Sequence, residues 1–158
     1  MKLNDIPFNE SSHNPITKYT EVKPSDIHGL GLFAKIKIPK GTIWWHAKPQ
    51  DVLIIKKDQF LKLDNSIKVP LIEKVMKALL TYSYYERELD ALIFCLDNSR
   101  YVNHSFNANS GASEDENGFM SVALRDILPG EEITEDYSMY TPCKWLKNYI
   151  QFFDPKCW

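Results

Sequence analysis

The pattern of hydrophobic and polar positions changes character twice along the chain. From Tyr19 onward, short apolar stretches alternate with polar positions and are separated by turn residues, a pattern typical of β-strands. The middle of the chain instead keeps apolar residues at helical spacing, which predicts one helix over 70–86 and a second short helix over 88–94. Strand character returns after Arg100. The pattern therefore predicts a mainly β fold with a helical insert, in the α+β class.

Short strands and the turns between them account for most of the predicted elements. The predicted strands cover 32–38, 42–45, 51–55, 119–124 and 133–137. Three turn sequences adjoin these strands: Pro39-Lys40-Gly41, Asn117-Gly118 and Leu128-Pro129-Gly130-Glu131.

The two ends of the chain differ from this central region. Residues 1–18 are polar and show no period, so we expect an arm that is ordered only by docking. The predicted domain covers 19–140, with its helical insert at about 56–99. Residues 141–158 are rich in aromatic side chains, which indicates a hydrophobic cap over the core or a contact between two copies of the chain.

Composition places the chain among globular proteins and disfavours several classes. Its 158 residues, 44% hydrophobic and 25% charged, suit one domain with a real core. Nineteen basic against twenty-one acidic residues give a formal charge of −2, which argues against direct nucleic-acid binding. The sequence shows neither a signal peptide nor an apolar run long enough to span a membrane. We therefore expect a soluble intracellular protein, cytoplasmic or nuclear, with secretion by a route lacking a recognisable signal still open.

The cysteines predict neither a disulfide framework nor a metal site. Cys95, Cys143 and Cys157 are odd in number, widely spaced and never in a Cys-x-x-Cys pair. A cysteine hydrolase using Cys95 with His104 is an alternative. It is disfavoured because Cys95 lies in an apolar run typical of a buried core.

A glycine-rich segment first suggests a nucleotide site. Gly29, Gly31 and Ala34 fit the pattern G-x-G-x-x-A, and Asp51 follows at the distance expected of a ribose-binding acid. That motif needs a helix after the glycines, but the residues after Ala34 alternate like a strand. The context therefore disfavours a dinucleotide site and leaves a hairpin turn that needs two flexible residues as the simpler interpretation.

Two polar segments follow, and neither decides a function when taken singly. Three asparagines and a histidine crowd the segment 100–109, which is typical of a hydrogen-bonded loop. Between Glu114 and Asp136, eight acidic residues stand against Arg125 alone. Such a stretch is either a solvated face or a surface that attracts a cationic peptide.

The order of these segments is more specific than any one of them. A Gly-x-Gly hairpin, then Arg100-Tyr101-Val102-Asn103-His104-Ser105, then Pro129-Gly130-Glu131-Glu132-Ile133-Thr134-Glu135-Asp136-Tyr137 resembles the SET-domain protein-lysine methyltransferases over about 19–140. The resemblance implies several small curved sheets with a knot-like C-terminal crossing. That crossing brings Asn103-His104 beside Asp136-Tyr137.

The resemblance also implies an activity and a set of site residues. The implied function is transfer of methyl groups from S-adenosylmethionine to the side-chain amine of lysine in a protein or peptide substrate. Tyr137 is the implied catalytic residue, against the alternative of a tyrosine packed in the core. The implied cofactor-binding residues are His28, Gly29, Leu30, Gly31, Asn103, His104, Tyr137 and Trp145, with Phe152 as an alternative to Trp145 over the adenine. The implied substrate-channel residues are Tyr101, Glu135 and Tyr140, although a packed aromatic is an equal alternative for Tyr101.

Three positions depart from the family's pattern. Ala108 stands where proline is usual, which relaxes the loop without removing a donor. Phe106 stands where some members place a cysteine, and the cysteine-rich flanks are missing, so no zinc site is predicted. The aromatic tail is then a candidate to close the lysine channel. Glu135 stands where many members have Tyr or Phe, so the number of methyl groups added is not readable, and a carboxylate there is a candidate to hold the incoming ammonium.

A catalytically inactive SET module that binds a basic peptide or partner protein is the alternative function. Retention of Tyr137, Asn103 and His104 favours the enzyme, because a binding module has no need of all three. The stretch Lys56–Lys77 holds six lysines against three acidic residues and is either a docking face or a solvated helix. A homodimer also stays open.

Overall fold

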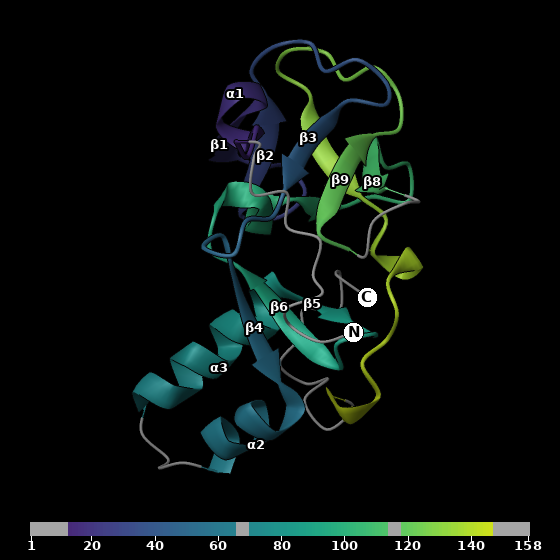
Figure 1. Cartoon of the computed structure of the whole chain (residues 1–158). Coiled ribbons are helices and arrows are strands. Elements are labelled where there is room, and N and C mark those ends of the chain that lie inside the picture. Colours follow the sequence, from purple (N-terminus) through teal and green to yellow (C-terminus); the bar gives the residue numbers. More distant parts are fainter. Residues whose placement is uncertain (1–12, 66–69, 114–117, 147–158) are drawn as a thin grey trace.

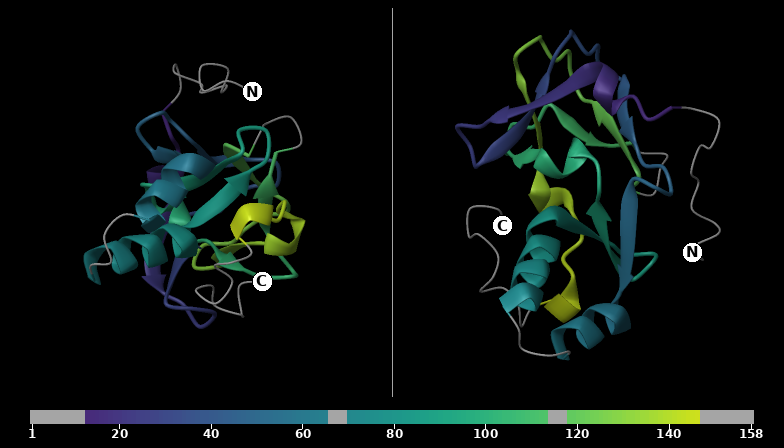
Figure 2. Two further views of the ribbon diagram at one scale, coloured as in Figure 1. Left: turned by 90° about the horizontal axis from the view of Figure 1, so that it is seen from below. Right: turned by 90° about the vertical axis from the view of Figure 1, so that its left-hand side faces the viewer.

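The computed structural model describes residues 13–65, 70–113 and 118–146, and within these residues it contains two β-sheets (Figure 1). The larger sheet consists of β1 (Thr20–Pro24), β2 (Leu30–Ala34), β3 (Ile43–His46), β7 (Asn103–His104), β8 (Ser110–Ala112), β9 (Met120–Ala123) and β10 (Glu132–Glu135). The smaller sheet consists of β4 (Val52–Lys56), β5 (Ser83–Glu86) and β6 (Ala91–Cys95), and it packs with helices α2 (Lys57–Asn65) and α3 (Pro70–Tyr82). The smaller sheet lies below the larger one in Figure 1, with α2 and α3 at the far end, and the chain after β10 runs from the larger sheet to the smaller (Figure 2). The mainly β, α+β prediction is confirmed.

Strands β1 and β2 form the predicted hairpin. They pair antiparallel from Thr20 opposite Ala34 to Pro24 opposite Leu30. The backbone N–H of Ser25 donates to the Gly29 carbonyl at 3.0 Å, and Gly29 has φ +50, a conformation that favours glycine. A strand rather than a helix follows the glycines, so the dinucleotide motif is absent from this segment.

Strand β10 joins parts of the chain that are far apart in sequence. It pairs antiparallel with β2 and parallel with β7 and β8. In the pairing with β7, Thr134 lies opposite Asn103 and Glu135 lies opposite His104. The predicted approach of the 103–104 segment to the end of the 133–137 strand is therefore present.

Two predicted helices need correction. The helix predicted over 70–86 ends at Tyr82, and β5 follows it. The short helix predicted over 88–94 is wrong, because Ala91–Cys95 is the central strand of the smaller sheet, paired with both β4 and β5. A strand that is buried on both faces has a continuous apolar run instead of alternation, and such a run resembles a short buried helix in sequence.

Two hydrophobic clusters form the core. One joins the larger sheet to strands β4 and β6 of the smaller sheet, and it includes Ile16 from the short helix α1 (Ile16–Tyr19), together with Leu32, Trp44 and Ile93. The other lies between the smaller sheet and helices α2 and α3, and Leu146 packs into it. The predicted arm and tail lie partly outside the described residues. No described helix is long and apolar enough to cross a membrane.

We expect Ile133→Ala to destabilise the protein by about 2–5 kcal/mol, because it leaves a cavity at a fully buried position of β10. Ile43→Ala is the matched control, since Ile43 on β3 is 41% exposed, and it should change the free energy of unfolding by less than about 1 kcal/mol. Urea denaturation of both variants measures the difference. Equal costs would contradict the central position of β10.

Candidate active site

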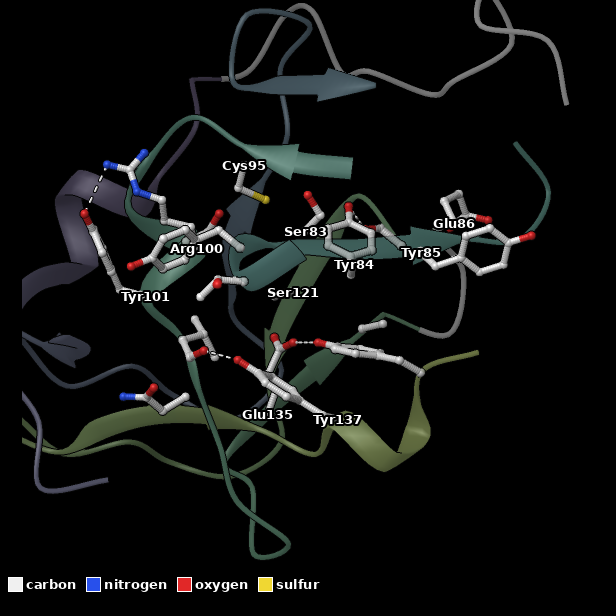
Figure 3. Close-up of a pocket in the computed structure, with 18 of the residues that line it drawn as sticks. Ser83, Tyr84, Tyr85, Glu86, Cys95, Arg100, Tyr101, Ser121, Glu135 and Tyr137 are labelled. Carbon is white, nitrogen blue, oxygen red and sulfur yellow. Dashed lines mark hydrogen bonds between the residues drawn. The ribbon is translucent and has the colours of Figure 1, made fainter. Parts of the chain in front are cut away.

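A pocket of about 1100 Å³ lies between the two sheets and is lined by residues of both (Figure 3). Eight of the residues named from the sequence line it: His28, Gly29, Leu30, Tyr101, Asn103, Glu135, Tyr137 and Tyr140. Gly31, His104 and Trp145 do not line it. The glycine hairpin, the asparagine loop and the end of β10 therefore meet at one cavity.

The segment that precedes β8 accepts hydrogen bonds from both the backbone N–H and the side-chain hydroxyl of Tyr137. The Tyr137 N–H donates to Nδ1 of His104 at 3.1 Å, and its hydroxyl donates to the Val102 carbonyl. Because Nδ1 accepts this bond, the neutral His104 ring carries its proton on Nε2. Asp136 caps the following 3₁₀ helix, η3 (Tyr137–Met139), by accepting from the Ser138 N–H at 2.9 Å. His104 thus positions Tyr137 from outside the pocket lining.

A carboxylate and several phenols form the cluster around Tyr137. Glu135 is 7% exposed and accepts hydrogen bonds from Ser110 Oγ at 3.1 Å and from the Tyr140 hydroxyl. The Tyr140 ring stacks on Tyr137 with centroids 5.6 Å apart, and Tyr84 lies 6.3 Å from Tyr140. Burial, with Glu135 nearby, raises the pKa of Tyr140 well above its usual value, and burial is also the main cause of the raised pKa of Tyr84. Both phenols therefore stay protonated as hydrogen-bond donors.

Four hydrogen-bond acceptors surround the side-chain amide of Asn103, three from the glycine hairpin and one from β10. The Asn103 Nδ2 lies 3.1 Å from Ser25 Oγ, 3.2 Å from the His28 carbonyl, 3.1 Å from the Leu30 carbonyl and 2.7 Å from Glu132 Oε1. An amide nitrogen has two hydrogens, so four acceptors exceed what it can satisfy. The four acceptors therefore compete for two hydrogens, and one of them, Ser25 Oγ, also donates its own hydrogen to Glu132 at 2.8 Å.

The residue at position 31 must be glycine because the Glu132 side chain lies where a Cβ would be. A Cβ added there would lie 2.2 Å from Glu132 Oε1, so any side chain would displace this carboxylate from Asn103. The sequence did not single out Glu132 or Ser25 for this site. Their signal was weak, because Glu132 lies in a run of acidic residues and Ser25 in an ordinary turn.

The acidic stretch does not form a single surface among its described residues. Glu131 pairs with Arg125, and Asp126 pairs with Lys37 at 2.6 Å. Glu132 and Glu135 point to internal partners instead. The described acids therefore do not act together as one solvated face or as one surface that attracts a cationic peptide, because each acid has its own partner.

Two predicted aromatic positions have different surroundings. The Trp145 ring packs against Phe60 at 5.4 Å and Tyr85 at 6.3 Å, and its indole N–H donates to Asp90 at 3.0 Å. It therefore belongs to the second core cluster, one layer behind the pocket. Tyr101 lines the pocket and contacts Tyr82 edge-on at 5.9 Å. Phe152 lies outside the described residues.

The pocket also contains a thiol, and its surroundings favour the protonated form. Cys95 is buried, and this burial raises its pKa from 9.0 to about 12. The nucleophilic form of cysteine is the thiolate, so this environment is unsuited to a cysteine hydrolase. Across residues 13–65, 70–113 and 118–146, no group of three or more His, Cys, Asp or Glu residues is placed to hold a metal ion.

Comparison with known proteins identifies the fold. A family model described as the SET domain matches residues 29–138, more than half of the chain. The Chaetomium thermophilum Polycomb Repressive Complex 2, in an autoinhibited conformation bound to S-adenosylmethionine, matches with a TM-score of 0.58 at 20% identity, over 84% of this chain and 16% of that chain. The Neurospora SET domain protein DIM-5, a histone lysine methyltransferase, matches with a TM-score of 0.51 at 15% identity, over 80% of this chain and 56% of that chain.

A Plasmodium falciparum candidate histone methyltransferase matches with a TM-score of 0.51 at 18% identity, over 75% of this chain and 92% of that chain. The chain thus spans most of the Plasmodium protein but only a small part of the Polycomb subunit. At these identities the matches show a shared fold. A search of curated protein sequences gives no match.

We expect Gly31→Ala to destabilise the protein by about 1–3 kcal/mol, because the added methyl group forces Glu132 away from Asn103. Gly111→Ala is the matched control on a strand of the same sheet, since its Cβ would meet Leu124 at an ordinary 3.5 Å. Thermal unfolding of both variants provides the measurement. A Gly31→Ala protein as stable as the control would mean that Glu132 has room to move.

We expect Cys95 in the folded protein to react with iodoacetamide at about pH 8 more than about 100-fold more slowly than in the urea-unfolded chain. The thiol is neutral when folded and ionises more readily when unfolded. Its contribution to stability is therefore present below pH 9.0 and is lost as pH rises toward about 12. Mass spectrometry of the Cys95 peptide separates it from the other cysteines. Rapid native alkylation would restore the hydrolase hypothesis.

Proposed function

The chain belongs to the SET-domain family, and on that premise we propose that it transfers methyl groups from S-adenosylmethionine to the side-chain amine of lysine in a protein or peptide substrate. The observation that carries the proposal is the shared pocket. The glycine hairpin and Asn103 line the same cavity as Tyr137. One of the similar structures is a histone lysine methyltransferase and another is bound to S-adenosylmethionine, which supports the same reaction class.

The residues of the hairpin fit the amino-acid portion of this cofactor. Its α-ammonium is a donor that matches the surplus acceptors at Asn103, namely the His28 and Leu30 carbonyls and the Glu132 carboxylate. Gly31 keeps this region free of a side chain. We assign His28, Gly29, Leu30, Gly31 and Asn103 to cofactor binding, with His104 acting through its bond to Tyr137.

Much of the rate acceleration in this reaction comes from orienting the two reacting groups. Bound S-adenosylmethionine supplies an electrophilic methyl group on a sulfonium. The protein must hold the amine in line with that methyl group, and such orientation is worth about 7–11 kcal/mol. The amine must also be neutral to attack, and desolvation by the tyrosines and other apolar groups of the lining favours that form.

Tyr137 is the proposed catalytic residue. Its hydroxyl hydrogen is donated to the Val102 carbonyl, so the phenol oxygen retains lone pairs for the amine N–H or for the polarised methyl C–H groups. The backbone bond to His104 fixes the ring from the other end. Tyr101 and Tyr140 are assigned to the wall of the channel that receives the lysine side chain.

We expect wild-type protein to bind S-adenosylmethionine and S-adenosylhomocysteine in calorimetric titration. Asn103→Ala should weaken that binding by at least about tenfold, since it removes the residue on which the acceptors converge. Tyr137→Phe should retain binding but lose about 100-fold in methyl transfer from labelled cofactor to a lysine peptide array. Tyr19→Phe, which changes a tyrosine outside the pocket lining, is the control for both measurements.

Absence of cofactor binding by the folded wild-type protein, with and without lysine peptides, would reject the enzyme. The inactive module that binds a basic peptide would then lead. Titration of the same peptides without cofactor tests that alternative directly.

A further inference from the structure

Glu135 is a buried carboxylate in the pocket lining, and the part of the chain that the structure describes gives it no cationic partner. It ends β10, is 7% exposed, and lies beside Tyr137 (Figure 3), and the Tyr140 hydroxyl donates to it. No Lys, Arg or His nitrogen of the described residues forms an ion pair with it. Burying a carboxylate is costly unless it is paired, so a cation that enters the pocket would gain this interaction.

The hydrogen bonds of Glu135 leave part of its acceptor capacity open. The described residues give it two donors, the Ser110 hydroxyl and the Tyr140 hydroxyl. A carboxylate offers about four lone-pair positions, so roughly two stay available. Ser110 is itself fixed by the Trp44 indole N–H, which donates to its Oγ at 2.8 Å. Ser110 therefore holds the carboxylate in place, and the remaining lone pairs of the carboxylate can accept hydrogen bonds from a ligand.

The other two acids of the lining, Glu86 and Glu88, are placed differently. Glu86 lies on β5, is only part-buried, and accepts from the backbone N–H of Glu88 at 3.0 Å, whereas Glu88 is exposed. Solvent screens an exposed carboxylate far more than a buried one. Of the three acids, Glu135 thus provides the strongest field for a cation.

We propose that Glu135 binds the ammonium group of the incoming substrate, with its N–H groups donating to the two carboxylate oxygens, before the amine loses the proton that must leave ahead of methyl transfer. This inference rests on the proposed function only in naming lysine as the source of the amine. The rings of Tyr84, Tyr137 and Tyr140 belong to the same pocket lining and contact one another there. Because the bond needs an N–H, the pocket selects unmethylated and partly methylated lysine over trimethyl-lysine.

Three small probes of similar shape test this assignment: n-butylammonium, N,N,N-trimethylbutylammonium and 1-butanol. Titrations into wild-type protein are followed by NMR. We expect n-butylammonium to bind about 30-fold more tightly than 1-butanol, the ratio expected of a buried charged pair, and more tightly than the trimethylated cation. Glu135→Gln, which keeps the shape of the side chain, should abolish the preference for the cation. Glu86→Gln should retain it.

Three results would overturn the proposal. The first is equal binding of n-butylammonium and 1-butanol by wild-type protein. The second is loss of the preference in Glu86→Gln but not in Glu135→Gln. The third is binding of the trimethylated cation as tight as that of n-butylammonium, which would indicate an aromatic cage without hydrogen bonding to Glu135.

A second measurement covers the case in which Glu135→Gln does not fold. In wild-type protein with ¹³C-labelled glutamate, the Cδ resonance of Glu135 should shift with n-butylammonium and not with 1-butanol, and an unchanged resonance would overturn the assignment. None of these titrations needs the cofactor. A protein that binds n-butylammonium through Glu135 but fails to bind S-adenosylhomocysteine would keep this inference and lose the methyltransferase, and the reverse result would do the opposite.

Discussion

The pairing of β10 with β2, β7 and β8 is the constraint on which the pocket depends. Strand β2 comes from one part of the chain and β7 and β8 come from another, and closing the loops between them and β10 costs conformational entropy. Asn109 offsets part of that cost. Its buried amide donates to the Glu132 carbonyl at 2.7 Å and accepts from the Thr134 N–H at 2.9 Å, so one side chain satisfies both polar groups of the β10 backbone next to Ile133. With β10 fixed in this way, Glu135 and Tyr137 point to the same cavity as Asn103.

A line of polar groups extends from the core to this cavity. It begins at the fully buried indole of Trp44 and passes through Ser110 and Glu135 to Tyr140. Every link has a donor and an acceptor, which is the condition for a buried polar network to be tolerated. The network makes the floor of the pocket rigid, whereas the residues above it line an open space between the sheets. Rigidity at the floor suits a reaction whose rate depends on orientation.

Sequence patterns predicted the parts of this structure that depend on local chemistry. The glycine hairpin needs a flexible turn at Gly29, and the strands around Trp44 and Ile133 have the expected apolar positions. The order of the three motifs also placed Asn103 and Tyr137 in one site. The pattern was misleading at β6, where burial on both faces removes the alternation by which a strand is recognised. It also gave no indication of Ser25 or Glu132, because their role arises from contacts across more than a hundred residues.

The position of β10 in the chain has a consequence for how the protein folds. Strands β2, β7 and β8 are complete by residue 112, but the strand that joins them begins at Glu132. A chain emerging from the ribosome therefore holds these strand edges unpaired until the residues of β10 are available. Exposed edges can pair with other chains, and long-range pairing is slow compared with helix formation. The hairpin β1–β2 and the helices α2 and α3 are local structures that can form first. The candidate site is then among the last parts of the domain to assemble, and shortening the chain before residue 132 would remove both this site and the strand that joins β2 to β7 and β8.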